Sequence, residues 1–126
     1  MITELGKNWN EILTQERIAV VKCYGDWCGP CKFFSPHFQK YTENFNVYND
    51  VPIKYYQSNN DKNRTFAKEY VVDRLPSMVF LVHGVMVYKI QGVSRQSVFE
   101  EILQKSLEVK FNVQKGEQHV ESAAIG

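Results

Sequence analysis

Cys28 and Cys31 are separated by two residues, a spacing that suits thiol–disulfide chemistry or metal binding. They lie in the run Trp27-Cys28-Gly29-Pro30-Cys31-Lys32, between an apolar stretch and a stretch with helical periodicity. This order predicts Cys28 at a helix N-terminus, where free backbone N–H groups and the helix dipole favour negative charge. We therefore expect its thiol pKa to fall below the free value of about 8.5.

The two cysteines can carry out a complete exchange reaction. Cys31 lies three residues further on the same helical face, within reach of the first sulfur. Gly29 has no side chain and lets the backbone of another protein approach. Pro30 stiffens the first turn of the helix, where its missing N–H would have no intrahelical partner. The Cys28 thiolate attacks a substrate disulfide; Cys31 then attacks Cys28, releases the reduced substrate and leaves a disulfide within the pair. An external reductant must restore the dithiol.

Two other interpretations of the pair are possible. A zinc site needs four ligands, and beyond the pair only Cys23 and His37 lie close in sequence, with no second C-x-x-C motif. A non-catalytic module would carry the cysteines without using them. The motif and its context favour dithiol–disulfide exchange over both, so we expect no metal and no cofactor.

The elements around the cysteines follow from periodicity. Residues 7–15 predict a helix, and residues 18–24 predict a central strand covered on both faces. Residues 28–45 predict a helix that Pro36 should kink; its buried stripe is Phe34, Phe38, Tyr41 and Phe45. Residues 46–51 form a polar connection, and residues 53–57 predict a second strand.

The second half predicts a helix, a hairpin and a final helix. A short helix spans residues 62–70, capped by Asn60 or Asp61. Strands at 77–82 and 85–90 are joined by a tight turn at His83-Gly84. Ser94 caps the last helix, whose buried stripe is Phe99, Ile102, Leu103 and Leu107. The order predicts an α/β fold, with a mixed central β-sheet flanked by α-helices on both faces.

Length and composition limit the alternatives. The 126 residues fit one domain, which we place at residues 1–107. Residues 108–126 form a C-terminal extension, with a possible short strand through Val109, Phe111 and Val113 and then a mobile tail. A formal net charge of +1 argues against a nucleic-acid partner. No apolar run has the length of a membrane helix, and three cysteines without a secretory signal pattern predict a cytoplasmic protein.

The hexapeptide WCGPCK resembles the active-site signature of the thioredoxin family, and the resemblance extends over about residues 5–107. Pro36 matches the proline of that family's active-site helix. Leu75-Pro76 matches its cis-proline dipeptide, which faces the cysteines and binds substrate backbone. Gly84 and Gly92 match family glycines. The resemblance implies a thioredoxin fold, a Cys28–Cys31 disulfide, disulfide-bearing client proteins, a thioredoxin-reductase-like electron donor and a monomer.

The resemblance also predicts the substrate surface and the direction of the reaction. A Gly-Pro dipeptide between the cysteines is typical of the reducing members. Trp27 is expected to shield the sulfur and contact substrate rather than fill the core. The surface that selects the partner comprises Trp27, Gly29, Pro30, Asp73, Arg74, Leu75, Pro76, Gly92 and Val93.

Two positions depart from the family pattern. Thioredoxins usually carry a buried aspartate where this chain has Lys22, and often a lysine where it has Gln57. Our hypothesis is that Lys22 favours the cysteine thiolates and makes the disulfide easier to reduce. Alternatively, Lys22 snorkels to solvent and affects the cysteines little. Cys23 points to the opposite face of the strand and is expected to be a core residue.

Three functions fit these features. The first is a general protein-disulfide reductase, an enzyme. The second is an interaction or structural module built on the same fold, in which the cysteines matter little. The third is a dedicated electron donor to one partner enzyme.

Overall fold

A five-stranded mixed sheet forms the centre of the structure, a computed structural model that describes residues 1–110. Its strand order is β1-β5-β2-β6-β7. Strands β1, β5 and β2 are parallel, whereas β6 and β7 are antiparallel to their neighbours. A small hairpin, β3–β4, stands apart. The strands are β1 (Ile2–Glu4), β2 (Ile18–Tyr24), β3 (Val47–Tyr48), β4 (Val51–Pro52), β5 (Lys54–Asn59), β6 (Ser77–Val82) and β7 (Val85–Gln91).

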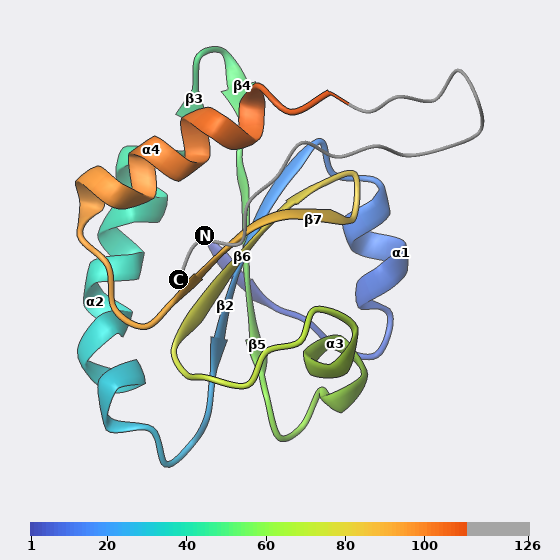
Figure 1. The fold of residues 1–126 in the computed structure, drawn as a ribbon, viewed down its shortest axis with the longest axis vertical. Helices are drawn as coiled ribbons and strands as arrows, with labels where there is room; N and C mark the ends of the chain where they lie inside the picture. Colours follow the sequence, from blue (N-terminus) through green and yellow to red (C-terminus); the bar gives the residue numbers. More distant parts are fainter. Residues whose placement is uncertain (111–126) are drawn as a thin grey trace.

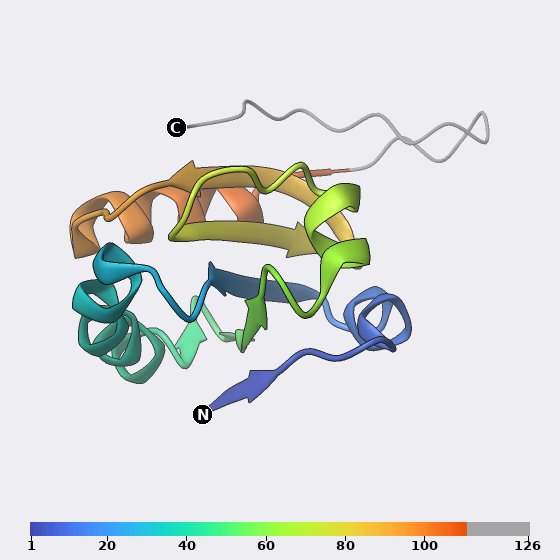
Figure 2. The same ribbon diagram turned by 90° about the horizontal axis from the view of Figure 1, so that it is seen from below.

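Helices cover both faces of the sheet, as predicted (Figure 1, Figure 2). The helices are α1 (Trp9–Thr14), α2 (Gly29–Asn44), α3 (Arg64–Glu69) and α4 (Gln96–Leu107). Helices α2 and α4 pack on one face around Phe34, Phe38 and Phe99. Helices α1 and α3 pack on the other around Leu13 and Phe66. Each face therefore has its own apolar core.

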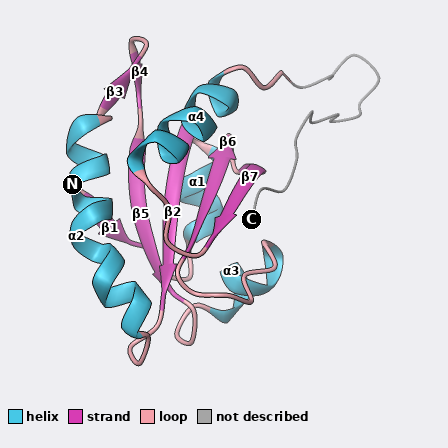
Figure 3. Ribbon diagram, turned by 60° about the vertical axis from the view of Figure 1, so that its left-hand side comes forward, coloured by secondary structure: helices cyan, strands magenta, loops and turns pink. Residues whose placement is uncertain are grey.

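Strand β2 lies in the middle of the sheet and leads directly to α2 (Figure 3). Its side chains alternate between the two cores: Val20 joins the α2/α4 side, whereas Val21 and Cys23 join the α1/α3 side. Because both faces are covered, the strand is buried almost throughout. A rigid central strand thus delivers Cys28 to the start of α2.

Two pieces of β-structure were not predicted from the sequence. Strand β1 has only three residues, too few for a periodic pattern. The predicted polar connection at 46–51 contains the β3–β4 hairpin, whose turn residues Asn49 and Asp50 have φ values of 50° and 65°. Two positive φ values fit a type I′ turn. The turn at His83-Gly84 was predicted correctly, with φ values of 49° and 81°.

The predicted helix caps were wrong. Helix α4 has Arg95 at its N-cap without a side-chain cap, and the Ser94 carbonyl instead accepts a hydrogen bond from the Tyr41 hydroxyl. Helix α3 has Asn63 at its N-cap, not Asn60 or Asp61. The turn before it is held by Asn59, whose Oδ1 accepts the backbone N–H groups of residues 61 and 62. Polar side chains close to a helix start are hard to rank, because neighbouring turns compete for them.

The predicted strand through Val109, Phe111 and Val113, and the predicted tail after it, lie outside the described residues from 111 on. Within residues 1–110, no helix combines the length and apolarity that crossing a membrane requires.

Candidate active site

Cys28 occupies the N-cap position of α2, as the sequence predicted. Its backbone is extended, with φ −102° and ψ 104°, and its Sγ accepts a hydrogen bond from the Cys31 backbone N–H at 3.1 Å. Pro30 lies in the first turn, where its missing N–H costs nothing. The N-terminus of α2 therefore presents a donor and the positive end of its dipole to the Cys28 sulfur.

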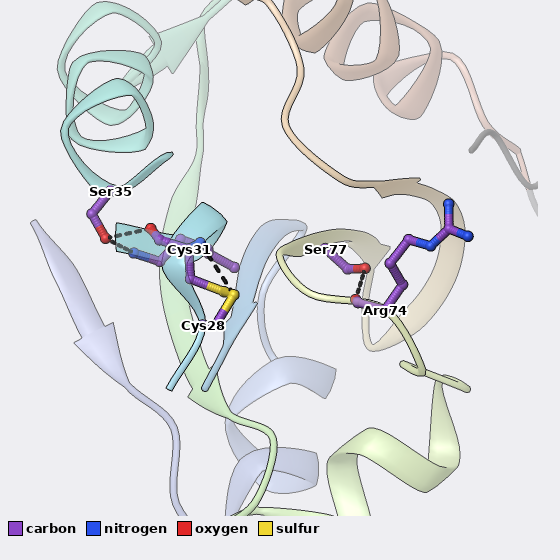
Figure 4. Close-up of a disulfide and its surroundings, with 6 residues drawn as sticks. Cys28, Cys31, Ser35, Arg74 and Ser77 are labelled. Carbon is purple, nitrogen blue, oxygen red and sulfur yellow. Dashed lines mark hydrogen bonds between the residues drawn. A yellow bond between two sulfur atoms is a disulfide. The ribbon is translucent and has the colours of Figure 1, made fainter. Parts of the chain in front are cut away.

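The two cysteines form a disulfide, and their Cα atoms lie 5.2 Å apart (Figure 4). Their accessibilities differ: Cys28 is partly exposed, whereas only 3% of Cys31 is exposed. An incoming molecule can therefore reach Cys28, whereas Cys31 is buried.

The loop before β6 lies across from the disulfide. The Leu75–Pro76 peptide bond is cis. A Cβ built on Gly25 would lie 3.1 Å from Leu75 Cδ1 and 4.0 Å from Cys28 Cβ, so Leu75 packs beside the turn that carries the cysteines. The Gly92 N–H donates to the Pro76 carbonyl at 2.7 Å, which ties the β7–α4 loop to the same place.

The other residues predicted to contact a client differ in how exposed they are. Trp27 is 95% exposed and Val93 45% exposed, so neither fills the core. A Cβ on Gly29 or Gly92 would meet nothing within 4 Å; Gly92 also has φ +87°, a conformation that favours glycine. The Arg74 carbonyl accepts a hydrogen bond from the Ser77 hydroxyl, and the Arg74 side chain extends away from the disulfide (Figure 4).

Lys22 lies beneath α2 and is only 4% exposed. Its Nζ donates to Ser35 Oγ at 2.9 Å, and Ser35 Oγ donates to the Cys31 carbonyl at 3.2 Å. The Nζ also lies 5.5 Å from the Phe38 ring centroid and 5.7 Å from that of Tyr24. The snorkelling alternative is therefore wrong: the ammonium group bonds to the active-site helix instead of extending into solvent.

A carboxylate from β1 belongs to the same group of side chains, although the sequence did not predict it there. In the sheet register Glu4 pairs with Gln57, and Gln57 pairs with Lys22. Glu4 Oε1 accepts hydrogen bonds from the Tyr24 hydroxyl and from Gln57 Nε2, both at 2.8 Å. Burial lowers the pKa of Lys22, and the Glu4 charge opposes that shift. No periodic signal predicted Glu4, because its position depends on strand pairing.

Cys23 is fully buried on the opposite face, as predicted. Burial raises the pKa of its thiol to about 12, an effect that the Lys89 charge only partly offsets. Its nearest strand partners are Ser58 and Ser77, and it makes no disulfide. In the described part of the chain no three His, Cys, Asp or Glu side chains gather as metal ligands would.

The sequence profile of the family described as Thioredoxin matches residues 1–105. The chain belongs to the thioredoxin family. It is 30% identical over 98 residues to the thioredoxin of Borreliella burgdorferi, covering 77% of this chain and 78% of that protein. The family match agrees with the Cys28–Cys31 disulfide in the structure. The domain is a thiol–disulfide oxidoreductase of the protein-disulfide reductase type, with a redox-active cysteine pair.

Other relatives extend the comparison. Thioredoxin-like protein 1 of Schizosaccharomyces pombe is 28% identical over 96 residues, which is 76% of this chain but only 32% of that protein. The chain thus spans about a third of that longer relative. The crystal structure of mitochondrial thioredoxin 3 from Saccharomyces cerevisiae in its oxidized form matches with a TM-score of 0.72 and 25% identity, over 82% of this chain and 94% of that chain.

Proposed function

We propose that this chain reduces disulfides in client proteins, with Cys28 as the nucleophile and Cys31 as the resolving thiol. The Cys28 thiolate attacks one sulfur of a client disulfide, and the other client sulfur leaves as a thiolate that takes up a proton. The Cys31 thiol loses its proton and attacks Cys28 Sγ, which releases the second client thiol. Two electrons pass to the client, and the Cys28–Cys31 disulfide remains.

The hydrogen bond from the Cys31 N–H to Cys28 Sγ is the observation that carries this assignment. A donor at a helix N-terminus stabilises a thiolate more than a thiol, so it favours the attacking form of Cys28. Cys28 is partly exposed, whereas Cys31 is buried. A client disulfide therefore meets Cys28 first, and Cys31 acts only after the mixed disulfide has formed on Cys28. The difference in accessibility supports the order of the two steps.

The surface around the sulfurs supports client binding. Exposed Trp27 and Val93 offer apolar contact, while Gly29 and Gly92 leave space for a client backbone. We assign Leu75 and Pro76 to client binding, since Leu75 packs beside the Cys28 turn. Arg74 contributes its backbone here, because its side chain points elsewhere (Figure 4).

We assign an electrostatic role to Lys22. A buried ammonium group next to α2 favours the reduced pair, in which a thiolate forms, over the neutral disulfide. The path from Lys22 through Ser35 to the Cys31 carbonyl connects this charge to the active-site helix. Gln57 and Glu4 limit the effect, because Glu4 supplies an opposing charge. The expected result is a disulfide that is easier to reduce than one above a carboxylate.

The electron source and the compartment follow from the same chemistry. A dithiol consumed in each cycle needs a thioredoxin-reductase-like donor to restore it. A free buried Cys23, in a chain that also has a reactive cysteine pair, suits a reducing compartment such as the cytoplasm. We propose that the chain works there as a monomer in electron transport to its clients.

Insulin reduction tests the proposal. Reduced wild-type protein should precipitate the insulin B chain; Cys28→Ser should lose this activity by about 1,000-fold or more, because no thiolate remains at the helix start. Cys31→Ser should trap a mixed disulfide between Cys28 and insulin, visible by mass spectrometry. Cys23→Ser is the matched control and should keep full activity. Activity that survives Cys28→Ser would refute the assignment and favour an interaction module.

A further inference from the structure

A groove lies beside the redox pair, between α2 and the segment that leads into α4. Its volume is about 420 Å³. Eight residues line it: Phe33, His37, Lys40, Tyr41, Val93, Ser94, Arg95 and Gln96. Phe33 comes two residues after Cys31, and Val93 follows Gly92, so the groove continues the surface on which a client disulfide must lie.

The groove presents apolar side chains on a fixed floor. Phe33 is 63% exposed, and its ring lies 5.1 Å from that of His37. Tyr41 forms the floor: its ring stacks on Phe99 at 5.1 Å, and its hydroxyl donates to the Ser94 carbonyl at 2.7 Å. The floor is thus set by the core, while Phe33 and Val93 remain available for contact.

The charged side chains that line the groove are all basic. Lys40 comes from α2 and Arg95 from the start of α4, and none of the eight lining residues is acidic. Across residues 1–110 the only salt bridge joins Lys105 to Glu101, so neither Lys40 nor Arg95 has an acidic partner there. Since the chain as a whole has a formal net charge of only +1, this is a local feature.

We propose that this groove binds the client segment that flanks the reactive cysteine, and that it selects segments with an apolar side chain and neighbouring acidic residues. The apolar side chain lies against Phe33 and Val93, and the carboxylates face Lys40 and Arg95. Complementary charge speeds the encounter and suppresses the wrong partner, so basic segments are disfavoured. This proposal rests on the function proposed above and names its preferred client class.

Two synthetic peptides provide the test. Each carries one cysteine linked by a disulfide to thionitrobenzoate and one leucine; acidic residues flank the cysteine in the first peptide, and lysines in the second. The Cys28 thiolate attacks the peptide sulfur and expels thionitrobenzoate, the better leaving group, which is followed by absorbance. Cys31 then attacks Cys28, releases the peptide thiol and leaves the protein disulfide. The rate of each peptide with the protein is divided by its rate with dithiothreitol. This ratio removes differences in the intrinsic reactivity of the two peptide disulfides.

The wild-type protein should react with the acidic peptide about five- to ten-fold faster than with the basic one at low salt, and the ratio should shrink at high salt. Lys40→Glu and Arg95→Asp should each reduce or invert the ratio; aspartate is also a good N-cap, so α4 should form normally. Lys54→Glu is the matched control. It has the same charge change as Lys40→Glu, but Lys54 pairs with Ala19 at the opposite end of β2 from Cys28, and it should leave the ratio unchanged.

Equal rates for the two peptides, or the same loss in Lys54→Glu as in Lys40→Glu, would overturn the proposal. The mixed disulfide of cysteine and thionitrobenzoate, too small to fill the groove, separates this failure from a failure of the enzyme. Wild type and the Lys54→Glu control should reduce it equally. A wild-type protein that does not reduce it would overturn the proposed function and this inference together.

Discussion

Lys22 and Lys89 are both buried, but they lie on opposite faces of the sheet and have different partners. Lys22 lies on the α2/α4 face, where its Nζ bonds to Ser35 on the active-site helix. Lys89, on β7, reaches the end of α3, where its Nζ donates to the Val71 carbonyl at 2.8 Å and to the Tyr70 carbonyl at 3.5 Å. One lysine thus bonds to backbone carbonyls and the other to the redox helix.

The partners of the two lysines differ in whether they respond to the redox state of the cysteines. The carbonyls around Lys89 keep their partial charge whatever the state of the cysteines, so this lysine contributes equally to both redox forms. The surroundings of Lys22 change when a disulfide becomes a thiolate and a thiol. We therefore expect a charge there to favour one form over the other. Variants on the two faces should therefore change different properties of the protein.

The largest contrast concerns the cysteines of the two faces. At pH 8 iodoacetamide should alkylate Cys28 at least about 1,000-fold faster than Cys23 in the folded, reduced protein, because only Cys28 has a substantial thiolate fraction. With a pKa raised to about 12, the Cys23 thiolate should increase tenfold per pH unit across the alkaline range. Mass spectrometry of the alkylated peptides measures both rates. In urea the two should converge; similar rates in the folded state would contradict the assignment.

Lys89→Met should destabilise the fold by about 1–3 kcal/mol, because the carbonyls of residues 70 and 71 lose their donor. Urea unfolding of the oxidized protein measures the change. The reduction potential should stay at the wild-type value. If the potential moves as far as it does in Lys22→Met, the division between the two faces fails.

Lys22→Met should make the reduction potential more negative by about 15–30 mV, equivalent to a three- to tenfold change in the exchange equilibrium. The sign follows because a cation favours the reduced form, and its removal makes the disulfide harder to reduce. Lys22→Asp should shift the potential further in the same direction. Equilibration with glutathione buffers gives the value, and Lys89→Met is the control. An unchanged or less negative potential in Lys22→Asp would count against the role of Lys22.

The smallest expected effect belongs to Glu4. Glu4→Gln removes the charge that partly offsets burial, so the pKa of Lys22 should fall further below its ordinary value. Titration of the Lys22 side-chain carbon signals by NMR detects the shift. Glu101→Gln is the control: it breaks the remote salt bridge with Lys105 and should leave the pKa of Lys22 unchanged. A rise in the pKa of Lys22 on removal of Glu4 would show that the two groups do not interact as described.

The sequence was enough to predict the redox pair and the strand and helix that carry it. A buried apolar run followed at once by Cys-Gly-Pro-Cys and a helical stripe leaves little freedom in where Cys28 lies. The hairpin at His83-Gly84 was also predictable from local sequence. Its two turn residues both have positive φ values, and glycine adopts such values readily. Local sequence decides these features.

The environment of Lys22 was not predictable to the same extent. The apolar strand placed Lys22 in a covered position but left open whether its side chain reached solvent. Its partners were not predicted: Ser35 comes from a helix, and Glu4 from a three-residue strand two places away in the sheet. The groove beside Phe33 likewise joins segments about sixty residues apart in sequence. Pairing register and helix packing decide these contacts, and neither leaves a periodic trace in one sequence.

The reduction potential of the Cys28/Cys31 couple in the wild-type protein decides whether the pair acts as a reductant or as an oxidant. A helix-capped pair that reduces its clients, with Lys22 easing reduction of its own disulfide, should lie between about −270 and −200 mV, where reducing members of this superfamily are found. A potential near −120 mV would make the chain an oxidant and contradict the account.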